Sequence, residues 1–388
     1  MRSERVPRLP TLGWYYLRSS VTHGEISAVI DSPARIWTTS GRAAIALALR
    51  EAGLRHGELV LMPSFHCPTM VAPAAHQGLS VDYYPLLPSG SADLAFIEQR
   101  FRQGKVRALL AAHYFGFPQP IAEIRDLCDR YDVVLIEDCA HAMFGIADGR
   151  PIGSWGDYAT ASLTKFFPVF TGGCLVSHRR TLRIKPAPEF SWLAEARSLL
   201  DSIELGARHD RFRGAGIPLR MLFGAKRALR GSPAEVSLEP TSREQAGASY
   251  FGFDEAQAMV YPPRFVTRIA LKADKKRIVE RRRSVFATMS SALEGLDGIA
   301  PVHRLLPETV APYVYPLLSE RPDHVFQSMR RQGIPVFRWD WLWPGTPEIQ
   351  NDTGVAWSRS LLQLPCHQDL TDSDVALIVS ALRNASSS

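Results

Sequence analysis

Long apolar runs, paired cysteine motifs and internal repeats are all lacking from this sequence of 388 residues. No run approaches the roughly 18 apolar residues that cross a membrane. The five cysteines are odd in number and show no C-x-x-C spacing, so neither a disulfide framework nor a structural zinc site is indicated, and a reducing cytoplasm fits best. The first twenty residues contain no continuous apolar stretch, and we expect no signal peptide.

The basic residues are not gathered into one strongly charged tail. The net charge is +6, and the densest basic run lies at residues 272–283. This run is interpreted as a solvated helix face, while a basic pocket rim would also suit an anionic small substrate such as a nucleotide diphosphate. No duplex-reading helix or aromatic platform is visible, so we expect no binding to nucleic acid.

Size and composition indicate a soluble globular enzyme with two packed units. Apolar residues make up 46% of the chain and charged residues 22%, which is neither a disordered nor a fibrous composition. A chain of 388 residues also exceeds what one ordinary core holds.

Short apolar runs alternate with amphipathic stretches from residue 36 to about residue 178. The strands are predicted at residues 58–62, 80–84, 106–112, 133–137, 158–163 and 174–177. The helices are predicted at residues 42–52, 68–77, 92–102 and 121–131. This alternation predicts a largely parallel sheet covered on both faces, with ligands beyond the carboxyl ends of its strands. Asp138, His113 and the loop of Lys165 fall near such ends and indicate one pocket.

The remainder of the chain divides at about residue 265. An N-terminal arm (residues 1–30) precedes a large unit (31–265), which includes a basic helical insert at about residues 181–245. That insert carries helical patches at 192–205 and 219–229. A long helix from near Phe265 should lead into a small unit (266–388), with short strands at 312–318 and 335–338 and a final helix at 372–382.

Lys165 and Asp138 carry the chemistry of the predicted pocket. Lys165 follows an apolar strand, and Asp138 ends the strand before it. An amine that forms a Schiff base and a carboxylate that keeps a ring nitrogen protonated are what an aromatic aldehyde cofactor needs. The alternatives are a surface lysine after an edge strand and an aspartate that caps the next helix.

A phosphate site is predicted from Ser40, Gly41 and Arg42. They open a helical stretch, whose unpaired N–H groups and positive dipole end favour an anion. Ser162, three residues before Lys165, could reach the same phosphate. A plain N-cap is the alternative for the Ser-Gly turn. His141 could donate to a phenolic oxygen of the ring or could pack in its turn.

In their order, these motifs resemble the DegT/DnrJ/EryC1/StrS family of pyridoxal-phosphate (PLP) enzymes, mostly sugar aminotransferases. The likeness covers roughly residues 36–178, then 253–259 and 361–367. It implies the fold-type I architecture: a large three-layer α/β/α domain with a mostly parallel seven-stranded sheet, a smaller C-terminal α+β domain, and a homodimer whose sites use both subunits.

The resemblance also implies roles for individual residues. Lys165 would form the Schiff base and shuttle protons, and Asp138 would pair with the pyridine nitrogen. The group around the phosphate would be Ser40, Gly41, Arg42 and Ser162. Because a lysine stands where some relatives carry the histidine of a dehydratase, amino transfer is favoured.

Four departures from the family pattern indicate a divergent branch. The usual Gly-Glu-Gly-Gly after the lysine is reduced to Thr171-Gly172-Gly173. His141 stands where most relatives have Gln. Counting places Cys67 at the position of the ring-stacking aromatic, so His66 or Phe65 would take that role by a local shift. The usual Asn-x-Arg that reaches the neighbouring subunit is replaced by Tyr250 and Gly252, and the tyrosine hydroxyl could still bond the partner's phosphate.

The sequence therefore favours a PLP-dependent aminotransferase that moves an amino group, from glutamate or another donor, to a keto sugar. The acceptor would be nucleotide-linked and belong to saccharide or secondary-metabolite synthesis. The alternatives are a PLP dehydratase, an aminotransferase of a non-sugar ketone and a non-catalytic relative. The insert could cover the partner's pocket, contact a pyrophosphate, lie on a membrane or be a solvated excursion. Further candidates for the substrate site are His113, His303, Arg338 and His367.

Overall fold

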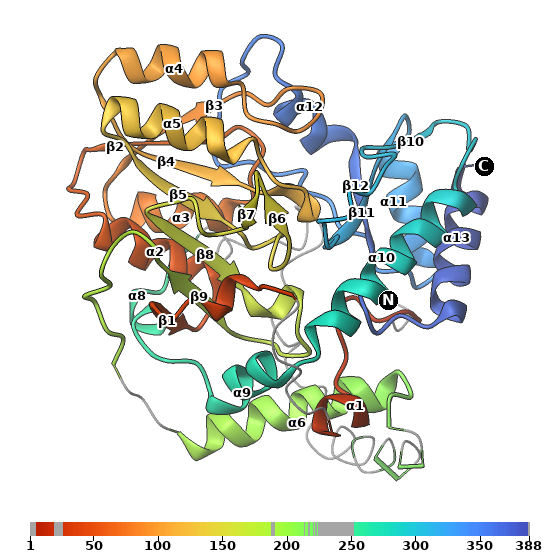
Figure 1. The fold of residues 1–388 in the computed structure, drawn as a ribbon. Helices are drawn as coiled ribbons and strands as arrows, with labels where there is room; N and C mark the ends of the chain where they lie inside the picture. Colours follow the sequence, from red (N-terminus) through yellow and green to blue (C-terminus); the bar gives the residue numbers. More distant parts are fainter. Residues whose placement is uncertain are drawn as a thin grey trace.

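A seven-stranded sheet forms the centre of the protein (Figure 1). The structure is a computed structural model that describes residues 5–18, 26–187, 191–212 and 252–386, together with residues 214, 215, 218, 219, 221 and 223. The strand order is β1-β9-β8-β5-β4-β2-β3. The strands are β1 (Arg35–Thr38), β2 (Leu59–Pro63), β3 (Ser80–Tyr84), β4 (Val106–Ala112), β5 (Val134–Asp138), β8 (Tyr158–Ser162) and β9 (Gly173–Val176).

Only β9 runs against the direction of the other strands. It pairs antiparallel with both β1 and β8, while β3, β2, β4, β5 and β8 pair in parallel. Consequently β1 runs in the same direction as β5 and β8, and the carboxyl ends of these strands lie at one edge of the sheet. This edge is where a ligand site is expected in such a fold.

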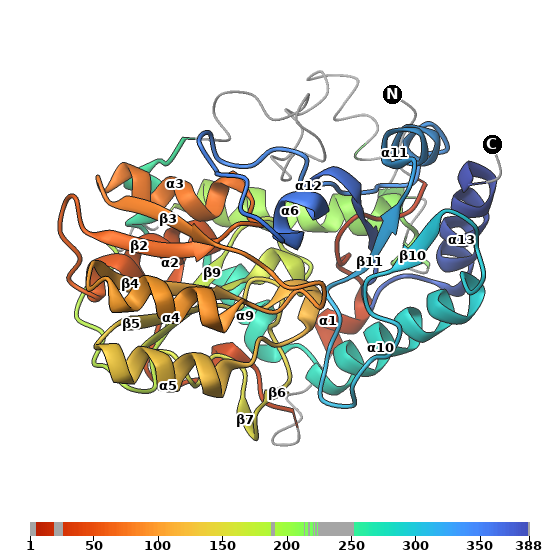
Figure 2. The ribbon, with the colours of Figure 1, turned by 90° about the horizontal axis from the view of Figure 1, so that it is seen from above.

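Helices cover both faces of the sheet, because its strands are apolar on both sides. In β4 and β5 nearly every side chain is buried, as in parallel sheets of this class. Figures 1 and 2 show α4 (Leu94–Arg102) and α5 (Ile121–Tyr131) on one face, with α2 (Gly41–Glu51) and α3 (Pro68–His76) on the other. The predicted α/β/α layering with a mostly parallel seven-stranded sheet is therefore confirmed.

A second group of elements lies beyond the carboxyl ends of the parallel strands (Figure 1). It contains a three-stranded antiparallel sheet and its helices, which enclose a second hydrophobic cluster. Its elements are α10 (Lys275–Ala292), β10 (Ile299–Pro301), β11 (Val314–Ser319), α11 (Pro322–Arg331), β12 (Leu361–Pro365) and α13 (Asp372–Ser386). Helix α12 (Thr353–Ser360) precedes β12 and packs its Trp357 into the cluster of the main sheet.

Shorter elements complete the described chain. They are α1 (Trp14–Arg18), η1 (Val29–Asp31), η2 (Tyr114–Gly116), β6 (Ile146–Ala147), β7 (Arg150–Pro151), η3 (Leu163–Lys165), α6 (Trp192–Arg208), α8 (Glu255–Ala258) and α9 (Arg264–Lys272). Within the described residues no helix is both long enough and apolar enough to cross a membrane. All five cysteines are buried, and none of them forms a disulfide bond.

Two sequence-based predictions about the C-terminal part need correction. The long helix expected from Phe265 is interrupted, because Asp274 accepts a hydrogen bond from the N–H of Arg277 (2.9 Å) and starts α10 as a separate helix. Residues 335–338 form no strand; the backbone of Phe337 makes a single bridge to Gln363. Most of the helix predicted at residues 219–229 lies outside the described residues.

Candidate active site

The ends of β1, β5 and β8 bring the predicted site residues together. In the sheet register, Gly173 of β9 lies beside both Thr38 and Ser162, and Thr160 lies beside Asp138. The start of α2 follows Thr38 after two residues. The predicted phosphate turn, Ser162 and Asp138 therefore share one edge of the sheet.

Lys165 ends the short 3-10 helix η3, directly after β8. Its side chain is buried, and its Nζ lies 5.4 Å from the centre of the Tyr313 ring. Its main-chain oxygen accepts a hydrogen bond from Arg282 Nη2 at 2.8 Å. The alternative of a surface lysine is therefore wrong, since the amine is enclosed at the carboxyl edge of the sheet.

Asp138 is a buried carboxylate at the last position of β5. Its Oδ1 accepts hydrogen bonds from the N–H of Ala140 (2.9 Å) and the hydroxyl of Thr160 (3.4 Å), whereas no described residue donates to Oδ2. Burial raises the pKa of Asp138, while the Ala140 N–H, the Lys165 charge and the Thr160 hydroxyl partly offset this rise. A buried carboxylate with one unsatisfied oxygen suits a cationic partner.

The N-terminus of α2 is packed tightly against β9. Ser40 is the N-cap, and its side chain accepts from the N–H of Ala43 at 3.1 Å, as the plain N-cap alternative requires. A Cβ on Gly173 would lie 2.3 Å from the carbonyl carbon of Ser40, and a Cβ on Gly41 would lie 3.3 Å from the Cβ of Ser162. Ser162 therefore adjoins the α2 N-terminus, which is the arrangement that a shared phosphate needs.

Arg42 and Ser162, the other side chains of the predicted phosphate site, contact residues of the protein. The Arg42 guanidinium donates to the main-chain oxygen of Gly252 at 3.0 Å. The hydroxyl groups of Ser162 and Thr164 lie 3.2 Å apart. The role of Arg42 and Ser162 at a phosphate stays a prediction.

His141 lies in an aromatic box. Its ring stacks on Tyr313 (centroids 4.4 Å apart) and packs near Trp339 (5.0 Å). Its Nδ1 accepts from the N–H of Phe115 at 3.5 Å, and burial, helped by the Lys165 charge, lowers the pKa of His141 well below its usual value. The ring is therefore neutral with its proton on Nε2, so it can donate to an oxygen.

The candidates for ring stacking lie in different surroundings. His66 is fully buried, stacks on Tyr83 (4.9 Å), and uses both ring nitrogens, one on Pro63 O (2.9 Å) and one on the N–H of Trp343 (3.0 Å). Burial lowers the pKa of His66 to about 4. These contacts hold His66 in a structural role and lend no support to stacking on a cofactor.

Phe65 and Cys67 flank His66. Phe65 packs against Trp339 and Tyr114 with centroids 5.0 and 5.5 Å away. The Sγ atom of Cys67 lies 2.8 Å from the hydroxyl oxygen of Thr69. The stacking residue is therefore still a prediction, and Tyr250 lies outside the described residues.

The other candidates for the substrate site each have neighbours of their own. His303 stacks on Phe117 (3.7 Å), and burial lowers its pKa to about 4. Arg338 pairs with Asp323 and lies 3.6 Å from Asp340. Of these candidates, only His367 lines a cavity together with Lys165.

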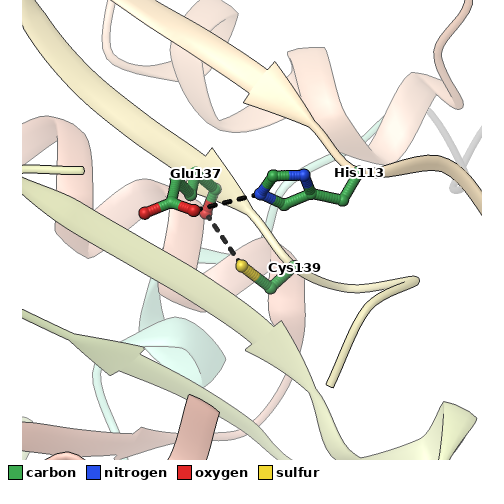
Figure 3. A group of neighbouring side chains, drawn as sticks. All are labelled: His113, Glu137 and Cys139. Carbon is green, nitrogen blue, oxygen red and sulfur yellow. Dashed lines mark hydrogen bonds and ion pairs between the residues drawn. The ribbon is translucent and has the colours of Figure 1, made fainter. Parts of the chain in front are cut away.

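His113, Glu137 and Cys139 form a compact group at the ends of β4 and β5 (Figure 3). His113 accepts from the N–H of Gln119 at Nδ1, so its Nε2 donates to Glu137 at 3.0 Å. The Glu137 oxygens also accept from three main-chain N–H groups, those of Gly153, Trp155 and Gly156. Because these hydrogen bonds occupy both carboxylate oxygens, the group stabilises the loop before β8.

The N-terminal segment closes over Lys165. A small cavity of about 10 Å³ contains Lys165 in its wall, together with Arg8, Pro10, Tyr313 and Phe337. This volume holds about one water molecule. A molecule larger than water does not fit this cavity unless the surrounding side chains rearrange.

Sequence reasoning missed Arg282, although its spacing contained a signal. Ile278, Arg282, Val285 and Met289 recur at helical intervals and form the buried face of α10, so the basic run at residues 272–283 is not wholly a solvated face. Arg282 is fully buried and donates to five oxygens of this region. Arg8 and Tyr313 had no comparable signal, because only the folded chain brings them to Lys165.

Comparison with known proteins supports the resemblance found in the sequence. Residues 23–185 match the model of the DegT/DnrJ/EryC1/StrS aminotransferase family. Lipopolysaccharide biosynthesis protein RfbH of Salmonella typhimurium is 31% identical over 153 residues, covering 37% of this chain and 34% of RfbH. GDP-perosamine synthase of Vibrio cholerae is 29% identical over 143 residues, covering 36% and 39%. The chain thus spans little more than a third of the length of these relatives.

Solved structures resemble the whole chain in fold. A putative sugar aminotransferase of Streptococcus pneumoniae, Spr1654, has a TM-score of 0.64 at 16% identity, with 98% of both chains covered. PseC of Helicobacter pylori, an aminotransferase involved in the biosynthesis of pseudoaminic acid, has a TM-score of 0.64 at 13% identity, with 99% of both covered. The predicted fold-type I architecture is confirmed.

Proposed function

Because residues 23–185 carry the sequence of the DegT/DnrJ/EryC1/StrS aminotransferase family, we propose that the protein is a PLP-dependent aminotransferase. Glutamate is the proposed amino donor and a nucleotide-linked keto sugar the acceptor. Relatives named for GDP-perosamine and for dTDP-3-amino-3,6-dideoxy-alpha-D-galactopyranose support this class of acceptor. The proposed setting is polysaccharide or secondary-metabolite biosynthesis in the cytoplasm.

The observation that carries the proposal is the convergence of three groups on one edge of the sheet. These are the buried amine of Lys165, the buried carboxylate of Asp138 and the N-terminus of α2 beside Ser162. Burial raises the pKa of Asp138 and the charge of Lys165 acts against that rise, so the two side chains share one electrostatic environment.

The residues present fit PLP. Asp138 Oδ2, which no described residue satisfies, would hold the pyridine nitrogen, and His141 Nε2–H would donate to the phenolic oxygen. Ser40, Gly41, Arg42 and Ser162 would hold the phosphate. When bound, PLP supplies an electron sink that stabilises negative charge on the substrate carbon.

Lys165 carries the proton in the proposed reaction. Its Nζ takes a proton from the substrate carbon in one half-reaction and returns a proton in the other. Arg282 fixes the main chain of Lys165, and the Tyr313 ring limits where Nζ can move. The apolar side chains around Lys165 keep bulk water away from the amine.

The proposal extends to the organisation of the protein. A large PLP-binding domain at residues 31–265, an arm at 1–30 and a small domain at 266–388 form each subunit. Two subunits form a homodimer, in which Tyr250 of each subunit reaches its partner's phosphate.

The test follows the purified protein with PLP and glutamate. Glutamate alone should change the visible absorption of the bound cofactor and release 2-oxoglutarate, which separates an aminotransferase from a dehydratase or a non-catalytic relative. Lys165→Ala should abolish both signals, and Lys105→Ala, at an exposed lysine, should change neither. A wild-type protein that shows neither signal with glutamate or other amino donors contradicts the proposal. A panel of nucleotide keto sugars then identifies the acceptor.

A further inference from the structure

The side chain of Gln363 is buried with an amide N–H donor that no described residue uses. Gln363 lies at the centre of β12 and is 1% exposed. Its main chain is satisfied, since it exchanges two hydrogen bonds of 2.9 and 3.0 Å with Phe337. Its side-chain Nε2 is fully buried and meets no acceptor among the described residues. An unmade hydrogen bond in such a place destabilises a fold and calls for an explanation.

The side chain of Gln363 faces the main sheet and not the C-terminal core. Alternate residues of a strand point to opposite faces. Leu362 and Leu364 belong to the hydrophobic cluster of the C-terminal elements, whereas Leu361 belongs to the cluster of the main sheet. Gln363 therefore shares the face of Leu361 and Pro365.

This face leads to the cavity beside Lys165. Pro365, two residues beyond Gln363, lines that cavity. Val314, which pairs with Pro365, lines the same cavity. Phe337, which pairs with Gln363, lines it as well. Gln363 thus stands one position along the strand face from the wall of the Lys165 cavity.

The polar groups of the cavity wall favour an oxygen-rich ligand. Lys165, Arg8 and His367 are its ionisable side chains with nitrogen, and no carboxylate lines it. The Arg8 guanidinium lies over the Phe337 ring, 4.2 Å from its centre. His367 donates to Pro7 O at 3.0 Å, and burial lowers its pKa to about 3, so it stays neutral. The buried amide N–H of Gln363, one position along the strand face from this wall, is a neutral donor for an oxygen.

We propose that Gln363 recognises the substrate by donating its amide N–H to an oxygen atom of the molecule bound beside Lys165. The inference rests on the proposed aminotransferase function and assigns a specificity residue to it. The oxygen belongs either to the carboxylate of the amino donor or to a hydroxyl group of the sugar. The fold tolerates the unpaired amide N–H because the bound substrate supplies its hydrogen-bond acceptor.

The first test measures thermal unfolding of the PLP-loaded protein without substrate. Gln363→Met keeps the length of the side chain and removes the unpaired amide, so the midpoint should rise by about 2–4 °C. Gln119→Met is the matched control. Gln119 is equally buried, but its Oε1 accepts from Ala92 (2.8 Å) and its Nε2 donates to Gly90 (3.0 Å). The control should lower the midpoint.

The second test measures half-saturation of the cofactor's spectral change. The probes are glutamate, GDP-perosamine and dTDP-3-amino-3,6-dideoxy-α-D-galactopyranose, each as an amino donor to the PLP form. Gln363→Met should raise the half-saturating concentration of at least one probe that wild type converts by about five- to tenfold, with the resting absorption unchanged. An effect on glutamate assigns the carboxylate, and an effect confined to an amino sugar assigns the hydroxyl.

Two results would overturn the role of Gln363. A lower unfolding midpoint for Gln363→Met would show that the amide has a structural partner. Unchanged half-saturation for every converted probe would show that no substrate oxygen uses it. Either result leaves the proposed function intact, which fails only if wild type responds to no amino donor.

Discussion

At the scale of single residues, the buried carboxylate of Asp138 lowers the stability of the folded protein. Its raised pKa means that the folded protein favours the protonated acid. The stability that Asp138 contributes is therefore present below its unfolded pKa of about 3.8 and is lost as the pH rises through the folded value. At neutral pH the carboxylate weakens the cofactor-free protein until a cation pairs with it.

Asp138→Asn should accordingly stabilise the cofactor-free protein at pH 7, and the difference should vanish below pH 3.8. Chemical unfolding at several pH values measures this. Asp157→Asn is the control with the opposite sign. Arg125, Arg180 and the N–H of Leu135 bond the Asp157 carboxylate, and its pKa is lowered. Asp157→Asn should therefore lower the stability of the cofactor-free protein at pH 7. A loss of stability in Asp138→Asn at pH 7 would contradict our account.

The position of Lys165 and Asp138 at the carboxyl edge of the sheet could be predicted from the sequence, because each stands at the end of an apolar strand run. An amine and a carboxylate at successive strand ends are rare and easily recognised. His66 was a weaker candidate, since counting along a loop does not give the direction of a side chain. The structure turns that ring toward Tyr83. Gln363 had no sequence signal, because an unpaired amide is visible only when its neighbours are known.

At the scale of elements, the contact of β9 with the start of α2 shapes the proposed phosphate site. The absence of a side chain at Gly173 allows the main chain of Ser40 and Gly41 to approach β9. Its φ angle lies outside the left-handed region, so space alone requires glycine here.

Gly173→Ala should therefore displace the N-terminus of α2. We expect a loss of about 1–3 kcal/mol in the free energy of unfolding, together with weaker binding of PLP, measured by absorption titration. Gly149→Ala is the control. Gly149 has a φ of 79° and open space around it, so its substitution strains only the local main chain. Unchanged affinity for PLP in Gly173→Ala would remove α2 from the phosphate site.

Arg282 connects α10 to the loop of Lys165. Its guanidinium donates to Gln368 Oε1 and to the main-chain oxygens of Lys165, Pro312, Tyr313 and Cys366. Burial lowers the pKa of Arg282 to about 10. These hydrogen bonds of the Arg282 guanidinium hold the start of β11, the end of β12 and η3 in one arrangement.

In Arg282→Lys the lysine should not restore the hydrogen bonds of the guanidinium, because an ammonium group lacks the planar set of five donors. We expect a loss of about 3 kcal/mol in the free energy of unfolding. Arg283→Lys is the matched control, since Arg283 is partly exposed and bonds only the main chain of Pro307 and Val310. Equal stability of the two variants would contradict this assignment.

The regular elements were predicted more accurately than the connections. Strands β3 and β4 and helix α5 have the predicted limits, because apolar runs and turn residues define them. Strand β1 was missed, since four residues with mixed burial carry little pattern. The break between α9 and α10 was also missed, because a single N-cap aspartate interrupts a continuous amphipathic sequence.

At the scale of the whole molecule, buried histidines link stability to pH. Burial lowers the pKa of five histidines, which therefore stay neutral in the folded protein: His66, His141, His209, His303 and His367. A lowered histidine pKa stabilises the fold above about 6.5 and loses this contribution as the pH falls through the folded value. Among the carboxyl groups of the described residues, Asp138 and Asp369 have raised pKa values and act in the opposite direction.

Unfolding at pH 5.5 should therefore take up protons, and the free energy of unfolding should fall steadily from pH 7 to pH 5. Denaturant titrations at each pH measure this slope. His303→Phe, which keeps the stacking on Phe117, should make the slope smaller by about one proton. A stability that is constant or rises over this range would contradict the prediction.

The arrangement of the two cores was predicted only in outline. Chain length indicated two packed units, and the alternation of strands and helices indicated the sheet. The N-terminal segment over Lys165 was not predicted, because Arg8 and Leu9 carry no periodic pattern and reach the site through contacts with residues more than 300 positions away.

The covalent attachment of the cofactor tests the central claim most directly. The protein is incubated with PLP, reduced with borohydride and digested, and the peptides are analysed by mass spectrometry. We predict one phosphopyridoxyl group, attached to Lys165, with much weaker labelling in Asp138→Asn. Absence of the label from the Lys165 peptide, or labelling spread over exposed lysines alone, would contradict the account.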